Sequence, residues 1–168
     1  MKALVVYESI YGNTQQVAEA IGKALSEQYD VTVAEVGETR YDALVGIDLL
    51  VVGGPTHMFG MSRGFSRDKT REAMKGREPV SRGIGVRDWL DQLPKVANAS
   101  AAAFDTRAHN VWRLPMGAAA RGIASRLEAH GYQLVAEPEG FFIKDTEGPL
   151  DEGELERAAQ WGHDLIER

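Results

Sequence analysis

Short runs of apolar residues alternate along the chain with segments whose apolar residues recur every three or four positions. The runs predict buried strands, because a strand covered on both faces carries apolar side chains in both directions. The periodic segments predict amphipathic helices that pack against the strands. The predicted strands are Lys2–Tyr7, Val31–Val36, Leu49–Gly53, Ala101–Phe104 and an interrupted strand at Tyr132–Ile143. The predicted helices are Thr14–Gln28, a short one at about Tyr41–Val45, Val86–Leu93, Met116–His130 and Glu152–Ile166.

Strands that alternate with helices are typical of an α/β protein built from right-handed strand–helix–strand units. In such a doubly wound sheet the ligand binds at the carboxyl ends of the strands, where the strand order reverses. Three strand exits should therefore meet, at Glu8–Thr14, Gly54–Arg63 and Asp105–Pro115. The stretch Gly60–Gly85 has no clear period and is expected to be irregular, and loops of this length are usually functional or mobile.

Composition narrows the class of protein. The length of 168 residues fits one domain with a substantial core. Cysteine is absent, which excludes disulfides, thiolate catalysis and Fe–S clusters. We see no signal peptide and no apolar run near the roughly 18 residues of a membrane span, so we expect a cytoplasmic protein without a membrane partner. The net charge of −6 disfavours nucleic acid, although residues 63–87 hold eight Lys and Arg against three acids.

The first strand exit carries the chemistry of an anion site. Ser9 and Thr14 supply hydroxyls, Asn13 an amide, and Gly12 lets the backbone approach a ligand closely. A turn between a strand and a helix also aims unpaired N–H groups and the positive helix end at one point, which suits a phosphate. The turn has no Lys or Arg, and the sequence patterns of P-loop NTPases and of dinucleotide-binding proteins are missing. The alternative is that the turn only caps the helix.

The pattern V-V-Y-x-S-x-x-G-x-T-x-x-x-A-x-x-I, from Val5 to Ile21, resembles the FMN-phosphate signature of the flavodoxin family. The spacing of strands and helices over nearly the whole chain is similar to that family as well. The resemblance implies a three-layer α/β sandwich with a five-stranded parallel sheet of order 2-1-3-4-5. With the length prior, it predicts a single domain over residues 1–168, in which a basic loop insertion at about 61–85 departs from ordinary flavodoxins. It also implies FMN as the cofactor, with its phosphate held by Ser9, Ile10, Tyr11, Gly12, Asn13 and Thr14.

By the same resemblance, the second strand exit would flank the isoalloxazine ring. Its pattern G-x-P-T-x-x-x-G is similar to the flavodoxin domains of diflavin and diiron enzymes and to quinone reductases of the tryptophan-repressor-binding type. The residues implied to contact FMN here are Pro55, Thr56, His57, Met58, Phe59 and Gly60. His57 could donate to the flavin or gate its protonation, because imidazole titrates near neutral pH. The alternative is a solvent-exposed loop histidine.

The third strand exit should border the pyrimidine edge of the ring. The residues implied are Asp105, Thr106, Arg107 and Trp112. Trp112 would stack on the flavin, worth about 0.5–1.5 kcal/mol beyond the buried area. Arg107 would place positive charge near N1 and O2. The alternatives are an ordinary core tryptophan and a surface arginine.

Two functions stay open at this point. The first is an electron carrier that docks a redox partner protein, either a reductase or an electron acceptor. The second is an NAD(P)H-dependent FMN quinone reductase, which would recruit Arg63, Arg67 and His57. The basic segment is either a flap that binds an acidic partner or the phosphates of NADPH, or a solvated loop. A phosphoacceptor receiver domain is disfavoured because the third strand ends in Gly53–Gly54, and no hydrolase motif occurs. The sequence identifies no catalytic residue and no metal ligand.

Overall fold

The computed structural model describes residues 1–57, 60–109 and 118–167. Its centre is a sheet in which the strands β2 (Asp30–Glu35), β1 (Lys2–Tyr7), β3 (Leu49–His57) and β5 (Ala99–Ala108) lie side by side in that order. All of these neighbours run parallel. The short strands β6 (Tyr132–Leu134) and β7 (Glu139–Ile143) both pair in parallel with β5. The predicted order 2-1-3-4-5 is confirmed, with β5 as its fourth strand and β6 with β7 as its fifth.

The break between β6 and β7 has a simple geometric origin. Leu134 pairs with Ala101 and Glu139 pairs with Phe104, so the outer chain advances five positions where β5 advances three. Two extra residues must therefore leave the ladder. Pro138 lies in this gap and has no N–H to donate, which is why the pairing is interrupted here.

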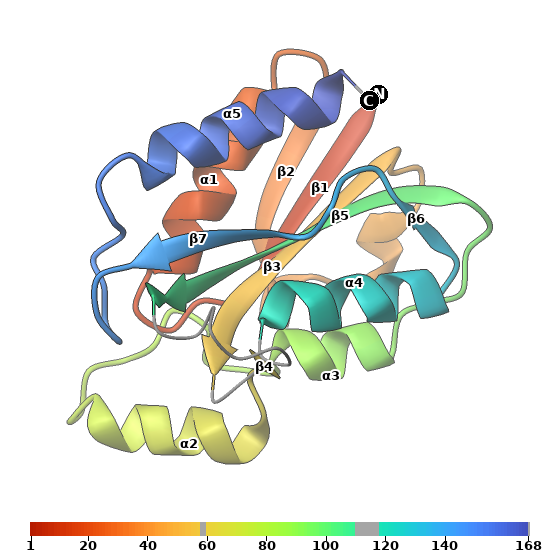
Figure 1. Ribbon diagram of the computed structural model, residues 1–168. Helices are drawn as coiled ribbons and strands as arrows, with labels where there is room; N and C mark the ends of the chain where they lie inside the picture. Colours follow the sequence, from red (N-terminus) through yellow and green to blue (C-terminus); the bar gives the residue numbers. More distant parts are fainter. Residues whose placement is uncertain (58–59, 110–117, 168) are drawn as a thin grey trace.

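Helices cover both faces of the sheet (Figure 1). The helices α1 (Asn13–Leu25) and α5 (Glu154–Ile166) pack beside each other on one face. The helices α3 (Val86–Asp91) and α4 (Ala119–Ala129) cover the other face. Two short 3₁₀ turns, η1 (Val36–Glu38) and η2 (Tyr41–Leu44), follow β2. Within the described residues, no helix is long and apolar enough to cross a membrane.

The core consists of two layers separated by the sheet. Alternate residues of β1 point to opposite sides, so that Leu4 and Val6 pack toward α3 and α4 while Ala3 and Val5 pack toward α1 and α5. The predicted packing roles of two tryptophans are confirmed by their place in these layers. Trp89 of α3 is buried in the first, and Trp161 of α5 is buried in the second.

The segment Gly60–Gly85, expected to be irregular, contains regular structure. The strand β4 (Gly60–Met61) forms an antiparallel hairpin with the end of β3, and helix α2 (Gly64–Ala73) follows it. Ser66 starts this helix by accepting the backbone N–H of Arg63 at 2.8 Å. The buried residues of α2 are Ser66 and Arg67 instead of apolar ones, so no apolar period marks the helix in the sequence. Lys75 and Gly76, with φ of 51° and 86°, turn the chain after it.

Candidate functional site

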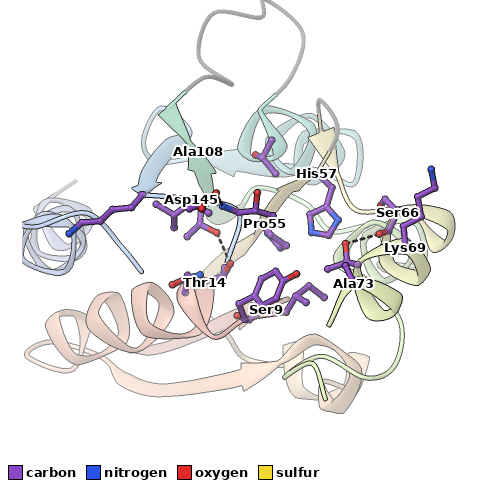
Figure 2. A pocket seen from close by; sticks show the side chains of 18 of the residues that line it. Ser9, Thr14, Pro55, His57, Ser66, Lys69, Ala73, Ala108 and Asp145 are labelled. Atoms are coloured by element: carbon purple, nitrogen blue, oxygen red, sulfur yellow. Dashed lines mark hydrogen bonds between the residues drawn. The ribbon is translucent and has the colours of Figure 1, made fainter. Parts of the chain in front are cut away.

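A hollow of about 610 Å³ lies at the carboxyl ends of β1, β3 and β5, where the three strand exits meet (Figure 2). Its volume falls in the range of small-molecule and cofactor sites. Five segments contribute to its walls: the turn after β1, the end of β3, helix α2, the end of β5 and the stretch after β7. The lining residues are Ser9, Ile10, Tyr11, Asn13, Thr14, Pro55, Thr56, His57, Ser66, Lys69, Thr70, Ala73, Thr106, Ala108, His109, Ile143, Lys144, Asp145 and Thr146.

The turn after β1 presents free backbone donors to this hollow. Gly12 has a φ of 94° and precedes the first residue of α1, and the first helical bond runs from the N–H of Gln16 to the Gly12 carbonyl. Within the described residues, no backbone or side-chain acceptor bonds the N–H groups of Asn13 and Thr14. Ser9 Oγ accepts the N–H of Gly12, so it caps none of the helical donors. The turn therefore does more than cap a helix, and its donor set fits a phosphate ester.

Neighbouring segments hold this turn rigidly in place. The hydroxyl of Thr14 is 2.7 Å from that of Thr106 on β5, and both residues are buried. The side-chain amide of Asn13 donates to the carbonyl of Glu147 at 3.0 Å. The two bonds join the turn to the third strand exit and to the stretch after β7. A ligand at the turn therefore meets donors whose positions are already fixed, which lowers the entropy lost on binding.

His57 lies at the end of β3 and points into the hollow (Figure 2). It is partly buried, and it pairs with Gly60 in the β3–β4 hairpin. Burial, with a smaller contribution from the positive charge of Arg67, lowers the pKa of His57 from 6.5 to about 4. The imidazole is therefore neutral at pH 7. The expectation that it titrates near neutral pH is wrong, as is the alternative of a fully exposed loop histidine.

Asp105 and Arg107 were expected at the flavin, but the structure does not bring them into the lining of the hollow. Asp105 is fully buried and accepts two bonds from Arg107, at 2.6 and 3.0 Å. It also accepts the N–H of Ala120 in the first turn of α4, at 2.8 Å. Burial raises the pKa of Asp105, and Arg107 opposes that rise. The guanidinium forms this ion pair and packs against Gly140, where an added Cβ would collide with it. The placement of Arg107 near N1 and O2 of the flavin stays a prediction.

The remaining candidates divide into three groups. Ser9, Ile10, Tyr11, Asn13, Thr14, Pro55, Thr56, His57 and Thr106 line the hollow as a set. Gly12 and Gly60 shape adjacent backbone without lining it. Met58, Phe59 and Trp112 lie outside the described residues.

Helix α2 adds a wall that the sequence did not reveal. Ser66, Lys69 and Ala73, labelled in Figure 2, line the hollow together with Thr70. These residues are spaced three and four positions apart, which is the helical period, and this spacing is the feature of the sequence that could have predicted the wall. The ammonium of Lys69 lies 4.6 Å from the ring centroid of Phe65, whose side chain is exposed.

His109 is a second lining residue that was not predicted. Its Nε2 pairs with a carboxylate oxygen of Asp151. Its ring stacks on Phe142, with 4.8 Å between centroids and 3° between planes. These two contacts hold the ring in the lining of the hollow. Asp151 lies 42 positions away along the chain, so no local pattern predicts the pairing.

Half of the cations in residues 63–87 are held in ion pairs. Arg67 pairs with Asp88 at 2.9 Å, and Arg77 pairs with Glu147 at 2.9 Å. The other two pairs are Arg71 with Asp68 at 3.8 Å and Arg82 with Glu78 at 2.6 Å. Two of these pairs, Arg67 with Asp88 and Arg77 with Glu147, use acids outside the segment and attach it to the body of the protein.

Comparison with known proteins agrees with this architecture. The family model described as flavodoxin matches residues 5–161. A flavodoxin from the domain Archaea shares 24% identity with a TM-score of 0.68, over 99% of this chain and 97% of that one. Flavodoxin 1 from Bacillus cereus shares 17% identity with a TM-score of 0.72, over 100% of this chain and 99% of that one. A flavodoxin described as WrbA-like, from Agrobacterium tumefaciens, shares 18% with a TM-score of 0.63, over 99% and 95%.

At these identities the solved structures support the fold alone, whereas the family model covers nearly the whole chain. The sheet order, the free donors after β1 and the hollow at the strand ends agree with that match. The chain belongs to the flavodoxin family, whose members bind FMN.

Proposed function

We propose that this protein is an electron carrier that binds FMN in the hollow and exchanges electrons with partner proteins. The observation that carries the proposal is the pair of N–H groups at Asn13 and Thr14, which no acceptor in the described part of the chain bonds, placed beside Gly12 in the wall of a cofactor-sized hollow. Neutral donors of this kind suit a monophosphate ester. The proposal keeps the cytoplasmic location expected from the sequence.

The residues that line the hollow fall into two groups, one for the phosphate of FMN and one for its ring. The phosphate would be held by the backbone of the turn after β1 and by the hydroxyl of Thr14. The ring would lie between the end of β3, with Pro55 and His57, and the end of β5, with Ala108 and His109. FMN supplies one-electron and two-electron redox chemistry when bound. The neutral imidazole of His57 can donate from one ring nitrogen and accept at the other without adding charge.

One contact favours the carrier over the NAD(P)H-dependent quinone reductase. Arg67 was a candidate for the phosphates of a nicotinamide cofactor. Its side chain is instead buried and paired with Asp88 at 2.9 Å. Releasing it for a ligand would break this pair and would remove the positive charge that Arg67 places near the buried carboxylate of Glu8, which is costly. Of the two candidate arginines, only Arg63 is exposed.

Flavin titration tests the FMN site. Purified protein should absorb near 450 nm, and apoprotein should bind FMN more tightly than riboflavin, which lacks the phosphate. Thr14→Val removes the hydroxyl and should weaken FMN binding about tenfold, because one buried hydrogen bond is lost. Gln16→Ala, at an exposed position on the same helix, is the matched control and should leave the affinity unchanged. Apoprotein that takes up no FMN would refute the proposed function.

Reduction by NADPH separates the carrier from the reductase. NADPH added to the FMN-loaded protein should leave the flavin oxidised on the timescale of minutes until a flavodoxin reductase is supplied. Rapid bleaching of the 450 nm band by NADPH alone would contradict the carrier and establish the reductase.

A further inference from the structure

Residues 62–86, which we call the strap, leave the end of β4, form α2 and return to the start of α3. The strap supplies one wall of the hollow through Ser66, Lys69, Thr70 and Ala73. In Figure 1 it projects beyond the sheet on the side of the β3–β4 hairpin. The wall is present only while the strap stays in this position, so the contacts that hold the strap matter for the site.

Both ends of the strap are tied to one buried carboxylate, that of Glu8 at the end of β1. Ser62 Oγ donates to Glu8 Oε1 at 2.5 Å, and the backbone N–H of Val86 donates to Glu8 Oε2 at 2.8 Å. Glu8 is fully buried, so water does not compete for either oxygen. Burial raises the pKa of Glu8, while these two donors and Arg67 lower it. The carboxylate thus has one oxygen for each end of the strap.

The strap also supplies the charge that compensates this buried acid. Arg67 donates to Ser62 Oγ at 3.3 Å and to Asp88 Oδ2 at 2.9 Å. Glu8, Ser62, Arg67 and Asp88 therefore form one connected polar network that crosses from β1 to α2 and α3. Buried networks of this kind are stable only when every member keeps its partner.

The middle of the strap is bonded to the turn that follows Glu8. The N–H of Ser9 donates to Ser81 Oγ at 2.9 Å, and the N–H of Ser81 donates back to the Ser9 carbonyl at 2.7 Å. The N–H of Val80 donates to the Ile10 carbonyl at 3.1 Å. The strap therefore braces the backbone of the same turn that carries the free phosphate donors.

We propose that Glu8 is a positioning residue of the FMN site, which closes the strap and thereby couples strap closure to occupancy of the turn after β1. This inference rests on the proposed function, because it concerns the site assigned to FMN. The coupling is reciprocal: a closed strap favours binding at the turn, and a ligand at the turn favours the closed strap. A phosphate contacts the braced backbone directly, so the phosphate group should carry most of the coupling.

Glu8→Gln tests the closure. Glutamine has one acceptor oxygen where the carboxylate has two, so one of the two donors loses its acceptor, and the negative charge that Arg67 compensates is removed. We expect FMN affinity to fall about tenfold and tryptic cleavage within the strap to become about tenfold faster, since cleavage follows the open population. Glu78→Gln is the same chemical change on the exposed part of the strap, where the acid pairs with Arg82, and it should change neither quantity.

A second control separates local opening from general loss of stability. Leu165→Ala truncates a buried side chain of α5, in the core layer on the other face of the sheet from α3 and α4. It should lower the unfolding midpoint without faster cleavage at the exposed Lys69 or Lys75. Ser62→Ala removes the donor to Glu8 Oε1 and should reproduce Glu8→Gln. If Glu8→Gln does not fold, the Ser62→Ala variant replaces it in both measurements.

Strap protection in wild-type protein tests the coupling with three probes. FMN and inorganic phosphate should each slow tryptic cleavage in the strap, and riboflavin should slow it least. The inference is overturned if riboflavin protects as well as FMN, or if Glu8→Gln and Ser62→Ala cleave at the wild-type rate. It is also overturned if Leu165→Ala opens the strap as much as they do. Wild-type protein that binds no FMN refutes the proposed function instead, while the cleavage rates without ligand still test the role of Glu8.

Discussion

The lowered pKa of His57 makes the ligand-free protein sensitive to acid. The unfolded chain protonates this imidazole near pH 6.5, whereas the folded protein protonates it only near pH 4. Between these values the unfolded state binds more protons, so the free energy of unfolding decreases as the pH falls. The contribution of His57 is complete above pH 6.5 and is lost progressively toward pH 4.

The size of the effect follows from the two pKa values. A shift from 6.5 to about 4 gives a loss of about 2 kcal/mol between pH 7 and pH 5. Glu8 and Asp105 act in the opposite direction, because burial raises their pKa values and the folded state then binds protons more readily. Their contribution is common to the wild type and to His57 variants, and therefore cancels in the comparison.

Urea unfolding at pH 7 and pH 5, without FMN, measures this difference. We expect the wild type to lose about 2 kcal/mol more than His57→Gln over this interval. His57→Phe is the matched control, because it also cannot titrate but fills the site differently. The two variants should differ in absolute stability and agree in their pH dependence. Equal losses in the wild type and both variants would refute the reasoning that His57 is held neutral by burial.

Two packing predictions concern the layer between the sheet and α1 with α5. Phe104→Ala should cost about 3–5 kcal/mol in urea unfolding, because Phe104 is fully buried and its ring meets Phe141 at 6.2 Å and Trp161 at 6.3 Å. A cost below about 1 kcal/mol would contradict this packing. Gly22→Ala should destabilise by about 1 kcal/mol despite the better helix propensity of alanine, because its Cβ would lie under 3.0 Å from Val33 Cγ2. The same change should be neutral or stabilising in a Val33→Ala background, and a cost that persists there would rule out the steric explanation.

The strand order was expected only from the family resemblance. The positions of the strands were predictable from the residues, because buried parallel strands carry the strongest local signal, a continuous apolar run. The same reasoning failed for α2. That helix is held by the Ser66 cap, and it buries Arg67 through partners at Ser62 and Asp88, contacts that no apolar period reports. Helices attached through polar networks are invisible to a method that searches for hydrophobic faces.

In the candidate site, too, features that belong to a local motif were predictable, and features that depend on contacts between distant segments were not. The turn after β1 was predictable because its donors belong to a local motif, and the structure brings all but Gly12 of its predicted residues to the hollow. The ion pair between Arg107 and Asp105 was not predicted. Asp105 lies two positions earlier on the same strand, so the two side chains share one face of β5. This pairing could have been predicted, whereas the pairing of His109 with Asp151 depends on contacts between distant segments.

The basic segment shows why a count of charges does not give the field at a site. Residues 63–87 sum to +5 in the sequence, yet Arg67 and Arg77 are paired with acids outside the segment, at Asp88 and Glu147. Among its described cations, Lys69 is the one that lines the hollow. Charge pairs at contact distance cancel most of each other's field beyond about one Debye length, roughly 8–10 Å in physiological salt. Any electrostatic effect of the segment on a bound flavin should therefore depend on Lys69 far more than on the net charge of the strap.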